Sequence, residues 1–136
     1  MRRTSSGLPD SPYRSWTPKL VDEVLAPDWE NNPLAPNVSA GSEGFKETIA
    51  FLRHVFPDIT ITIEDVVVSG DRAAVRTVAR GTHKAEMMGI PATGRQVEFN
   101  ASDIHRVEGG RIVQSWHLED YVGLLSQLGA TFSAAS

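Results

Sequence analysis

The sequence predicts a single α+β domain in which helices precede a curved antiparallel sheet. Apolar residues recur at helical spacing between residues 17 and 56, and at strand spacing from residue 59 onward. Short turns that contain glycine separate the strand-like stretches, and short connections join antiparallel neighbours. We therefore expect a cone-shaped sheet of about four strands wrapped around the N-terminal helices, with a short helix near the C-terminus.

Composition bounds the function. The chain has 136 residues, of which 40% are hydrophobic and 22% charged, as expected for one globular domain with an apolar core. A formal net charge of −4 without a basic run makes nucleic acid a poor partner. The absence of cysteine excludes disulfides and thiol chemistry, and it suits a cytoplasmic location. No apolar run approaches the length that spans a bilayer, so no membrane partner is expected.

The domain organisation follows from a change in composition near residue 17. Residues 1–16 contain four serines and two prolines and little periodicity, so they are predicted to form an extended or mobile arm. Residues 17–136 are then the single folded domain.

The first helix is predicted to be short. Thr17 can act as its N-cap, and Pro18 suits the first helical position. Pro27 ends it after barely two turns. Residues 28–37, DWENNPLAPN, are rich in asparagine and proline and predict a loop.

The second helix is the longest predicted one and spans Glu43 to Phe56. Ser42 can serve as its N-cap, and Pro57 stops it. One apolar stripe follows the spacing i, i+4, i+7 and i+11, and it consists of Phe45, Ile49, Leu52 and Phe56.

Strand periodicity then takes over. The predicted strands run from Ile59 through the three valines at 66–68, from residue 73 to 81 and on towards Met88, from 96 to 107, and from 111 to 118. A last helix is predicted from Tyr121 to Leu128, with Gly129 just after its end.

Two histidines and several acidic residues lie close to a tryptophan in the stretch from residue 103 to residue 123. Counting alternate residues along the last strand places Leu118 and Asp120 on one face with Trp116, and His117 on the opposite face. Asp120 can be read as the N-cap of the last helix, or as a carboxyl whose pKa is raised by an apolar pocket so that it exchanges a proton near neutral pH. His105 is either a structural histidine or a partner of that carboxyl.

A metal site is not predicted here. Asp103, His105 and Asp120 form a generic set without the spacing of known zinc motifs.

Four segments resemble the SnoaL-like polyketide cyclases, also called ester cyclases. They are FPDITITIEDVVVSGDRAAVR, GTHKAEMMGIPATGR, DIHRVEGGRIVQSWHLED and the later GLLSQLG. The resemblance implies the α+β cone of the nuclear-transport-factor-two-like superfamily. It also implies an intramolecular aldol condensation that closes the last ring of a polyketide ester, without a metal or an organic cofactor.

The resemblance also implies roles for particular residues. Asp120, four residues after Trp116, matches the general acid/base, and His105 matches a histidine that lines the same cavity. Two departures stand out: the usual long first helix is cut short at Pro18, and Asn32 replaces a histidine that many members carry. The expected contacts of the substrate are Asn32, Phe51, Met87, Phe99 and Trp116.

Other functions remain open at this point. The same cone could host a double-bond isomerase or an epoxide hydrolase, for which the available charged residues are Glu64, Arg76, Arg80 and Asp103. It could also bind a small hydrophobic metabolite without chemistry. We further expect a homodimer, or a higher homo-oligomer, through the sheet face away from the helices, where the strand count places Val113, Ser115 and His117.

Overall fold

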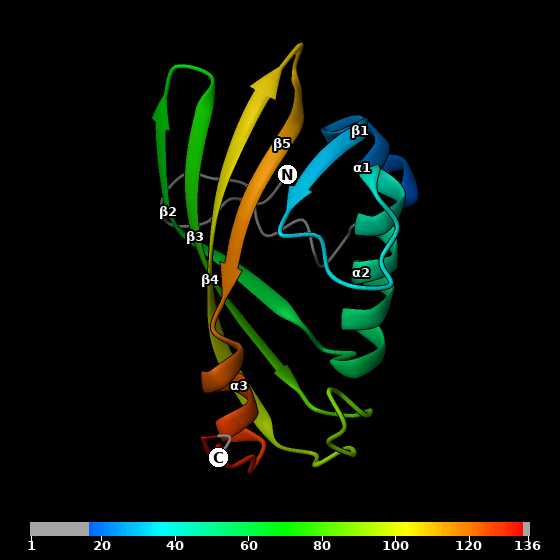
Figure 1. The fold of residues 1–136 in the computed structure, drawn as a ribbon, viewed down its shortest axis with the longest axis vertical. Coiled ribbons are helices and arrows are strands. Elements are labelled where there is room, and N and C mark those ends of the chain that lie inside the picture. The colour runs from blue at the N-terminus through cyan, green and yellow to red at the C-terminus, as the bar shows by residue number, and fades with distance from the viewer. Residues whose placement is uncertain (1–16, 135–136) are drawn as a thin grey trace.

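A five-stranded curved sheet and three helices make up the computed structural model, which describes residues 17–134 (Figure 1). The chain order is α1 (Pro18–Val24), β1 (Leu25–Asn32), α2 (Gly41–Val55), β2 (Thr60–Ser69), β3 (Arg72–Thr82), β4 (Gln96–Glu108), β5 (Arg111–Glu119) and α3 (Tyr121–Gln127). The α+β prediction is confirmed. The predicted arm, residues 1–16, lies outside the described residues, so the domain boundary stays a prediction.

The first helix begins as its capping signals predict. The Thr17 side chain accepts a hydrogen bond from the backbone N–H of Leu20 at 3.1 Å, and Pro18 is the first helical residue. The helix ends at Val24, before Pro27, because the chain turns extended at Leu25 and enters a strand.

Strand β1 corrects the predicted loop at residues 28–37. It lies at the edge of the sheet and pairs with β5 in parallel, so the sheet order is β1-β5-β4-β3-β2. An edge strand tolerates Pro27, which has no N–H to donate, and the pairing is irregular between Leu25 and Glu30. The four antiparallel strands are thus confirmed, and a fifth, parallel one was missed.

Helix α2 begins earlier than predicted. Its N-cap is Ala40, which makes no side-chain cap, so the prediction of Ser42 as the cap is wrong. Gly41 has a φ of +73°, and a Cβ there would collide with the carbonyl oxygen of Pro27. Glycine therefore lets the start of α2 approach β1 closely.

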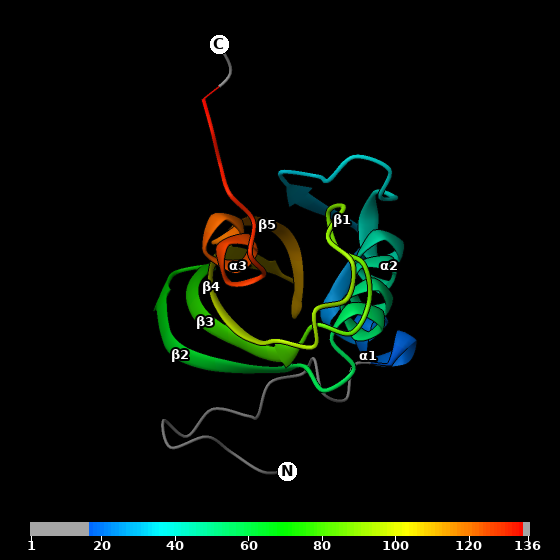
Figure 2. The same ribbon diagram turned by 90° about the horizontal axis from the view of Figure 1, so that it is seen from below.

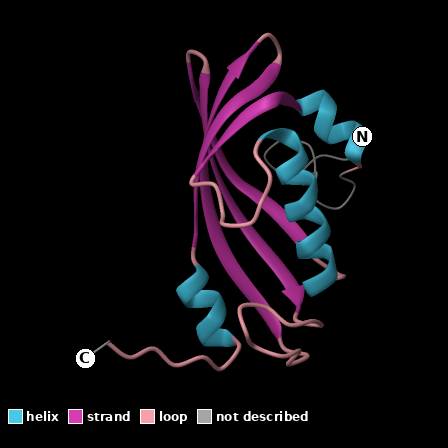
Figure 3. Cartoon of the chain, turned by 45° about the vertical axis from the view of Figure 1, so that its right-hand side comes forward, coloured by secondary structure: helices cyan, strands magenta, loops and turns pink. Residues whose placement is uncertain are grey.

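The side of the sheet that packs against α2 is called the concave face below. Seen from below, the strands curl into an arc with α2 to one side (Figure 2). Figure 3 shows α2 lying along the sheet and α3 near the start of β4. One buried cluster joins the end of α2 to this face and to α3, and contains Val55, Phe56, Ile61, Ala79, Val97, Phe99 and Leu124. A second joins α1, β1 and α2 and contains Val21, Leu25, Trp29 and Ile49.

The segment after β3 is a loop and not the predicted continuation of the strand. β3 ends at Thr82, and the His83 backbone N–H bonds to the carbonyl of Arg95, which closes the loop at its base. Met87, at 3% exposure, anchors the loop in the core.

Candidate active site

Pairing between β4 and β5 decides which side chains face the concave side. Residues directly opposite each other in an antiparallel pair project from the same face. Ser115 is 1% exposed and bonds to Trp29, which packs against Ile49 of α2, so Ser115 and its partner His105 face the helices. Alternation then gives the concave-face pairs of this site, which are His105 with Ser115, Asp103 with His117, and Ala101 with Glu119.

The opposite face carries residues that were expected inside. Trp116 lies opposite Ile104, and Leu118 lies opposite Ser102, so both point away from α2. The prediction that Trp116 and Leu118 share a cavity wall with His105, and that His117 lies outside, is therefore wrong. The count started from Asp120, which follows the strand and does not share its alternation.

Asp120 begins helix α3 and is exposed. Its Oδ1 accepts a hydrogen bond from the backbone N–H of Gly123 at 2.9 Å. A Cβ on Gly123 would collide with the Asp120 carboxylate, so glycine makes room for this cap. The geometry agrees with the capping interpretation, while a catalytic role for Asp120 remains a prediction.

Asp103 is the carboxyl on the concave face whose pKa departs most from its ordinary value. Its pKa is raised to about 6, mainly by burial; the charge of Glu119 also raises the pKa, and the charge of His117 lowers it. A carboxyl that titrates near neutral pH can accept a proton and return it.

His117 is held between two hydrogen-bond acceptors. Its Nδ1 lies 2.6 Å from Oε1 of Glu119, and its Nε2 lies 2.8 Å from the carbonyl oxygen of Pro33. Only an imidazolium donates from both ring nitrogens. The bond to Glu119 is the main cause of the raised pKa of His117, which favours that charged form beside Asp103.

His105 lies in a different environment two residues further along β4. Its Nδ1 is 2.7 Å from Oγ of Ser115, which also accepts a hydrogen bond from Nε1 of Trp29 at 2.9 Å. Burial lowers the pKa of His105, so its neutral form is favoured. The concave face thus holds a neutral imidazole, a titratable carboxyl and an imidazolium along two adjacent strands.

Tyr121 borders the same group from the first turn of α3. Burial, together with the charge of Glu119, raises the pKa of its hydroxyl to about 12, so it stays a hydrogen-bond donor at neutral pH. Tyr121, Glu119 and His117 were not predicted as site residues from the sequence. Counting alternation from the hairpin turn at Gly109 and Gly110 would have found the last two.

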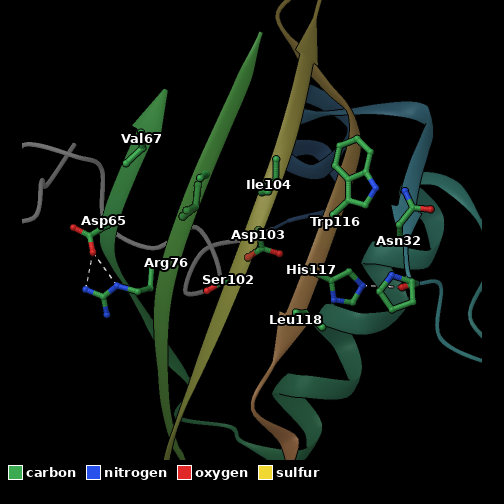
Figure 4. A pocket seen from close by; sticks show the side chains of 13 residues that line it. Asn32, Asp65, Val67, Arg76, Ser102, Asp103, Ile104, Trp116, His117 and Leu118 are labelled. Atoms are coloured by element: carbon green, nitrogen blue, oxygen red, sulfur yellow. Dashed lines mark hydrogen bonds and ion pairs between the residues drawn. The ribbon is translucent and has the colours of Figure 1, made fainter. Parts of the chain in front are cut away.

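A groove of about 740 Å³ runs along the face away from α2, and Figure 4 shows the side chains that line it. Much of its wall is apolar and projects from that face, including Val67, Ala74, Ile104, Trp116 and Leu118. Asp103 and His117 also border the groove, although strand alternation directs their side chains to the concave face. Asn32 also lines it, with its amide bonded to the Ser115 carbonyl at 3.2 Å. The predicted substrate residues Asn32 and Trp116 therefore meet in this groove and not with His105.

The other three predicted substrate residues lie elsewhere. Phe99 and Met87 belong to the buried core, and Phe51 is 46% exposed on α2. The structure therefore does not bring the five predicted contacts together in one cavity.

The charged residues of the hydrolase alternative also lie apart. Arg76 pairs with Asp65 at 2.7 Å, and Arg80 pairs with Glu98 at 3.1 Å. Arg76 and Arg80 lie opposite Ser102 and Glu98 on the face away from α2. Within residues 17–134, no group of three histidine or carboxylate residues is placed to hold a metal ion. The same residues contain no helix that is long and apolar enough to cross a membrane.

Comparisons with known proteins agree on one family. The SnoaL-like polyketide cyclase profile matches residues 10–128. The nogalonic acid methyl ester cyclase of Streptomyces nogalater is 28% identical over 114 residues, which cover 80% of this chain and 83% of the relative. Among solved structures, TsrD from Streptomyces laurentii has a TM-score of 0.81 at 33% identity and covers 88% of both chains. Wild-type IdmH from Streptomyces antibioticus has a TM-score of 0.76 at 38% identity, over 88% of this chain and 91% of its own.

The chain belongs to the SnoaL-like polyketide cyclase family. The predicted family, the cone-like α+β fold and a cyclase enzyme class are confirmed at this level.

Proposed function

We propose that this chain closes a ring in a polyketide ester by intramolecular aldol condensation, with Asp103 as the general acid/base. The observation that carries the proposal is a carboxyl with a pKa of about 6 on the concave face, directly opposite His117. Such a carboxyl is mostly ionised at neutral pH and still regains a proton readily.

The proposed reaction needs one base and one returned proton. The Asp103 carboxylate removes a proton from a carbon that lies between two carbonyl groups. The resulting enolate carbon attacks a second carbonyl carbon of the same chain, which forms the new C–C bond and an alkoxide. The alkoxide takes the proton back from the Asp103 carboxyl, so atoms and charge balance without a further reactant.

The His117–Glu119 pair sets the state of Asp103 in this proposal. The imidazolium stabilises the Asp103 carboxylate and keeps the pKa from rising further, while Glu119 fixes the imidazole ring. Proton transfer by a positioned group contributes about 10²–10⁴ in rate, and holding the chain in a ring-closing conformation contributes much of the rest.

The substrate class follows from charge and from the relatives. Asp103 and Glu119 repel a free carboxylate, whereas an esterified chain end carries no charge. The relative named above acts, by its name, on a nogalonic acid methyl ester. We therefore infer a polyketide methyl ester as the substrate of this chain.

The test is turnover of nogalonic acid methyl ester across pH 5 to 9. We expect kcat/KM of the wild type to rise with a midpoint near pH 6, and Asp103→Asn to lower kcat by about 10²–10⁴. Asp120→Asn is the matched control, because asparagine caps a helix as well as aspartate does. Turnover that survives in Asp103→Asn would remove Asp103 from the mechanism. No turnover of any polyketide ester by the wild type would count against the function.

We also propose that a second copy of the chain covers the face away from α2. Val67, Ile104 and Leu118 are 66%, 44% and 77% exposed there and form an apolar surface. The dimer face thus keeps its predicted side of the sheet but contains different residues. Leu118→Glu should halve the mass measured by light scattering, and a wild type at monomer mass would contradict the proposal.

The cytoplasmic location remains a prediction.

A further inference from the structure

Three polar groups form a hydrogen-bonded chain from the core to the concave face, with Trp29 and Ser115 buried and His105 half-buried. Nε1 of Trp29 donates to Oγ of Ser115 at 2.9 Å, and the same oxygen lies 2.7 Å from Nδ1 of His105. Trp29 is 6% exposed and Ser115 is 1% exposed, so water does not readily substitute for these contacts. The three residues come from three strands, β1, β5 and β4.

The direction of each hydrogen bond follows from the donors available. An indole nitrogen can only donate, so Ser115 accepts from Trp29. The other described partner of the Ser115 hydroxyl is His105. If Nδ1 of His105 also donated, the hydroxyl hydrogen of Ser115 would be buried without an acceptor, which is costly. Ser115 therefore donates to Nδ1 of His105.

This direction fixes the tautomer of His105. A neutral imidazole whose Nδ1 accepts must carry its proton on Nε2. Nε2 has no hydrogen-bond partner within residues 17–134, and the side chain projects from the concave face on the same side as Asp103. The two residues are separated by one position on β4, which is about 7 Å along a strand.

We propose that Trp29 and Ser115 are positioning residues that hold His105 as a neutral Nε2–H donor to the substrate oxygen on which negative charge develops. The role in catalysis rests on the function proposed above, whereas the tautomer does not. Burial favours the neutral ring that this arrangement requires.

The proposal divides the work between two neighbouring groups. Asp103 moves the proton, and His105 stabilises the enolate and alkoxide oxygens by a hydrogen bond that is already oriented before the substrate arrives. His105 neither gains nor loses a proton in the cycle. A histidine acting as a base would need a free lone pair on Nε2, which is the opposite tautomer.

The first experiment measures the tautomer directly by ¹⁵N NMR of the imidazole rings in the full chain at pH 7.5. The His105 signals are assigned by their loss in His105→Gln. We expect a protonated Nε2 and an unprotonated Nδ1 in the wild type, and a shift towards mixed tautomers in Ser115→Ala. Ser102→Ala, on the other face of β4, is the control and should leave the pattern unchanged.

The second experiment measures kcat on the polyketide ester. Removal of one oriented donor costs about 10²–10³ in kcat, so His105→Ala should lose that much. A glutamine side chain can place an N–H near the Nε2 position, so His105→Gln should stay within about tenfold of the wild type. Ser115→Ala should lower kcat without moving the pH midpoint, which Asp103 sets. Circular dichroism and thermal melting identify variants that do not fold.

The outcomes separate this inference from the proposed function. A protonated Nδ1 in the wild type overturns the inference, whether or not the enzyme turns over. A fully folded His105→Gln variant that is as inactive as His105→Ala also overturns it. If the tautomer is as expected but no polyketide ester is converted by the wild type, the proposed function fails and the role of His105 as a donor in this reaction fails with it.

Discussion

Strands β4 and β5 present two very different surfaces. On the concave face they carry Asp103, His105, His117 and Glu119, with altered pKa values for the first three. On the other face the same strands carry Ile104, Trp116 and Leu118, which line an apolar groove. Neighbouring residues on one strand therefore serve two surfaces: one face carries the titratable groups, and the other carries an apolar surface suited to binding.

The difference between the faces is a difference in solvation. On the concave face the Asp103 carboxyl is withdrawn from water, and this burial raises its pKa. Arg76 and Asp65, on the other face, pair in the open at 51% and 61% side-chain exposure, where an ion pair contributes little. Burial, and not the mere presence of charged residues, marks the candidate site.

The largest expected effect of this difference in solvation is on stability, and it is tested by removing the half-buried carboxyl of Asp103. The folded-state pKa of Asp103 is raised from 3.8 to about 6, so folding favours the protonated form. Its contribution to stability is therefore full below about pH 4 and is lost as the pH rises through 6. The Asp103→Asn variant cannot ionise at this position, so it does not lose stability as the pH rises. We expect the free energy of unfolding of this variant at pH 8 to exceed that of the wild type by about 1–2 kcal/mol, after allowing for the partial exposure of the side chain.

Urea unfolding of both proteins at pH 4 and pH 8 checks this expectation. The gain should vanish at pH 4, where both side chains are neutral. Ser102→Asn introduces the same amide on the other face and serves as the control, with no comparable pH dependence. A gain of equal size at both pH values would show that packing, and not ionisation, distinguishes the variant.

A second test concerns the charge opposite Asp103. His117 lowers the pKa of Asp103, so His117→Gln should move the midpoint of the pH–rate profile upward and reduce kcat/KM severalfold at pH 6. Arg72→Gln removes a cation from the other face, where Arg72 lies 5.0 Å from the centre of the Trp116 ring. That control should leave the midpoint in place. A downward shift in His117→Gln would contradict the assignment of charges.

Much of the fold could be predicted from local pattern, and the site could not. Helix α2 and the four antiparallel strands follow periodicity and turn residues that are visible in the sequence. β1 has no such signal, because its parallel pairing with β5 depends on residues more than 80 positions away. Proline and asparagine in a loop-like segment hid a strand that the edge of the sheet accommodates.

The error in the site has an equally local cause. Asp120 can be read from the sequence either as the last residue of β5 or as the N-cap of α3, because the sequence does not show where β5 ends. In the structure β5 ends at Glu119 and Asp120 is the cap. Treating Asp120 as a strand residue reversed the two faces of β5, so His117 and Trp116 exchanged places in the prediction. The raised pKa of Asp103 depends on its burial in the folded chain and on the charge of Glu119, and no spacing in the sequence encodes that environment.

Asp120 itself gives the last and smallest test of the two faces. Asp120→Ala removes the bond from Gly123 and should lower the free energy of unfolding by about 1 kcal/mol, whereas Asp120→Asn keeps a cap and should change it little. If chemistry belongs to the concave face, both variants should retain kcat within a few-fold, because the exposed cap holds only the start of α3. Thermal unfolding and turnover measured on the same samples separate the two effects. A folded Asp120→Asn variant without turnover would return the general base to Asp120 and leave Asp103 with an electrostatic role alone.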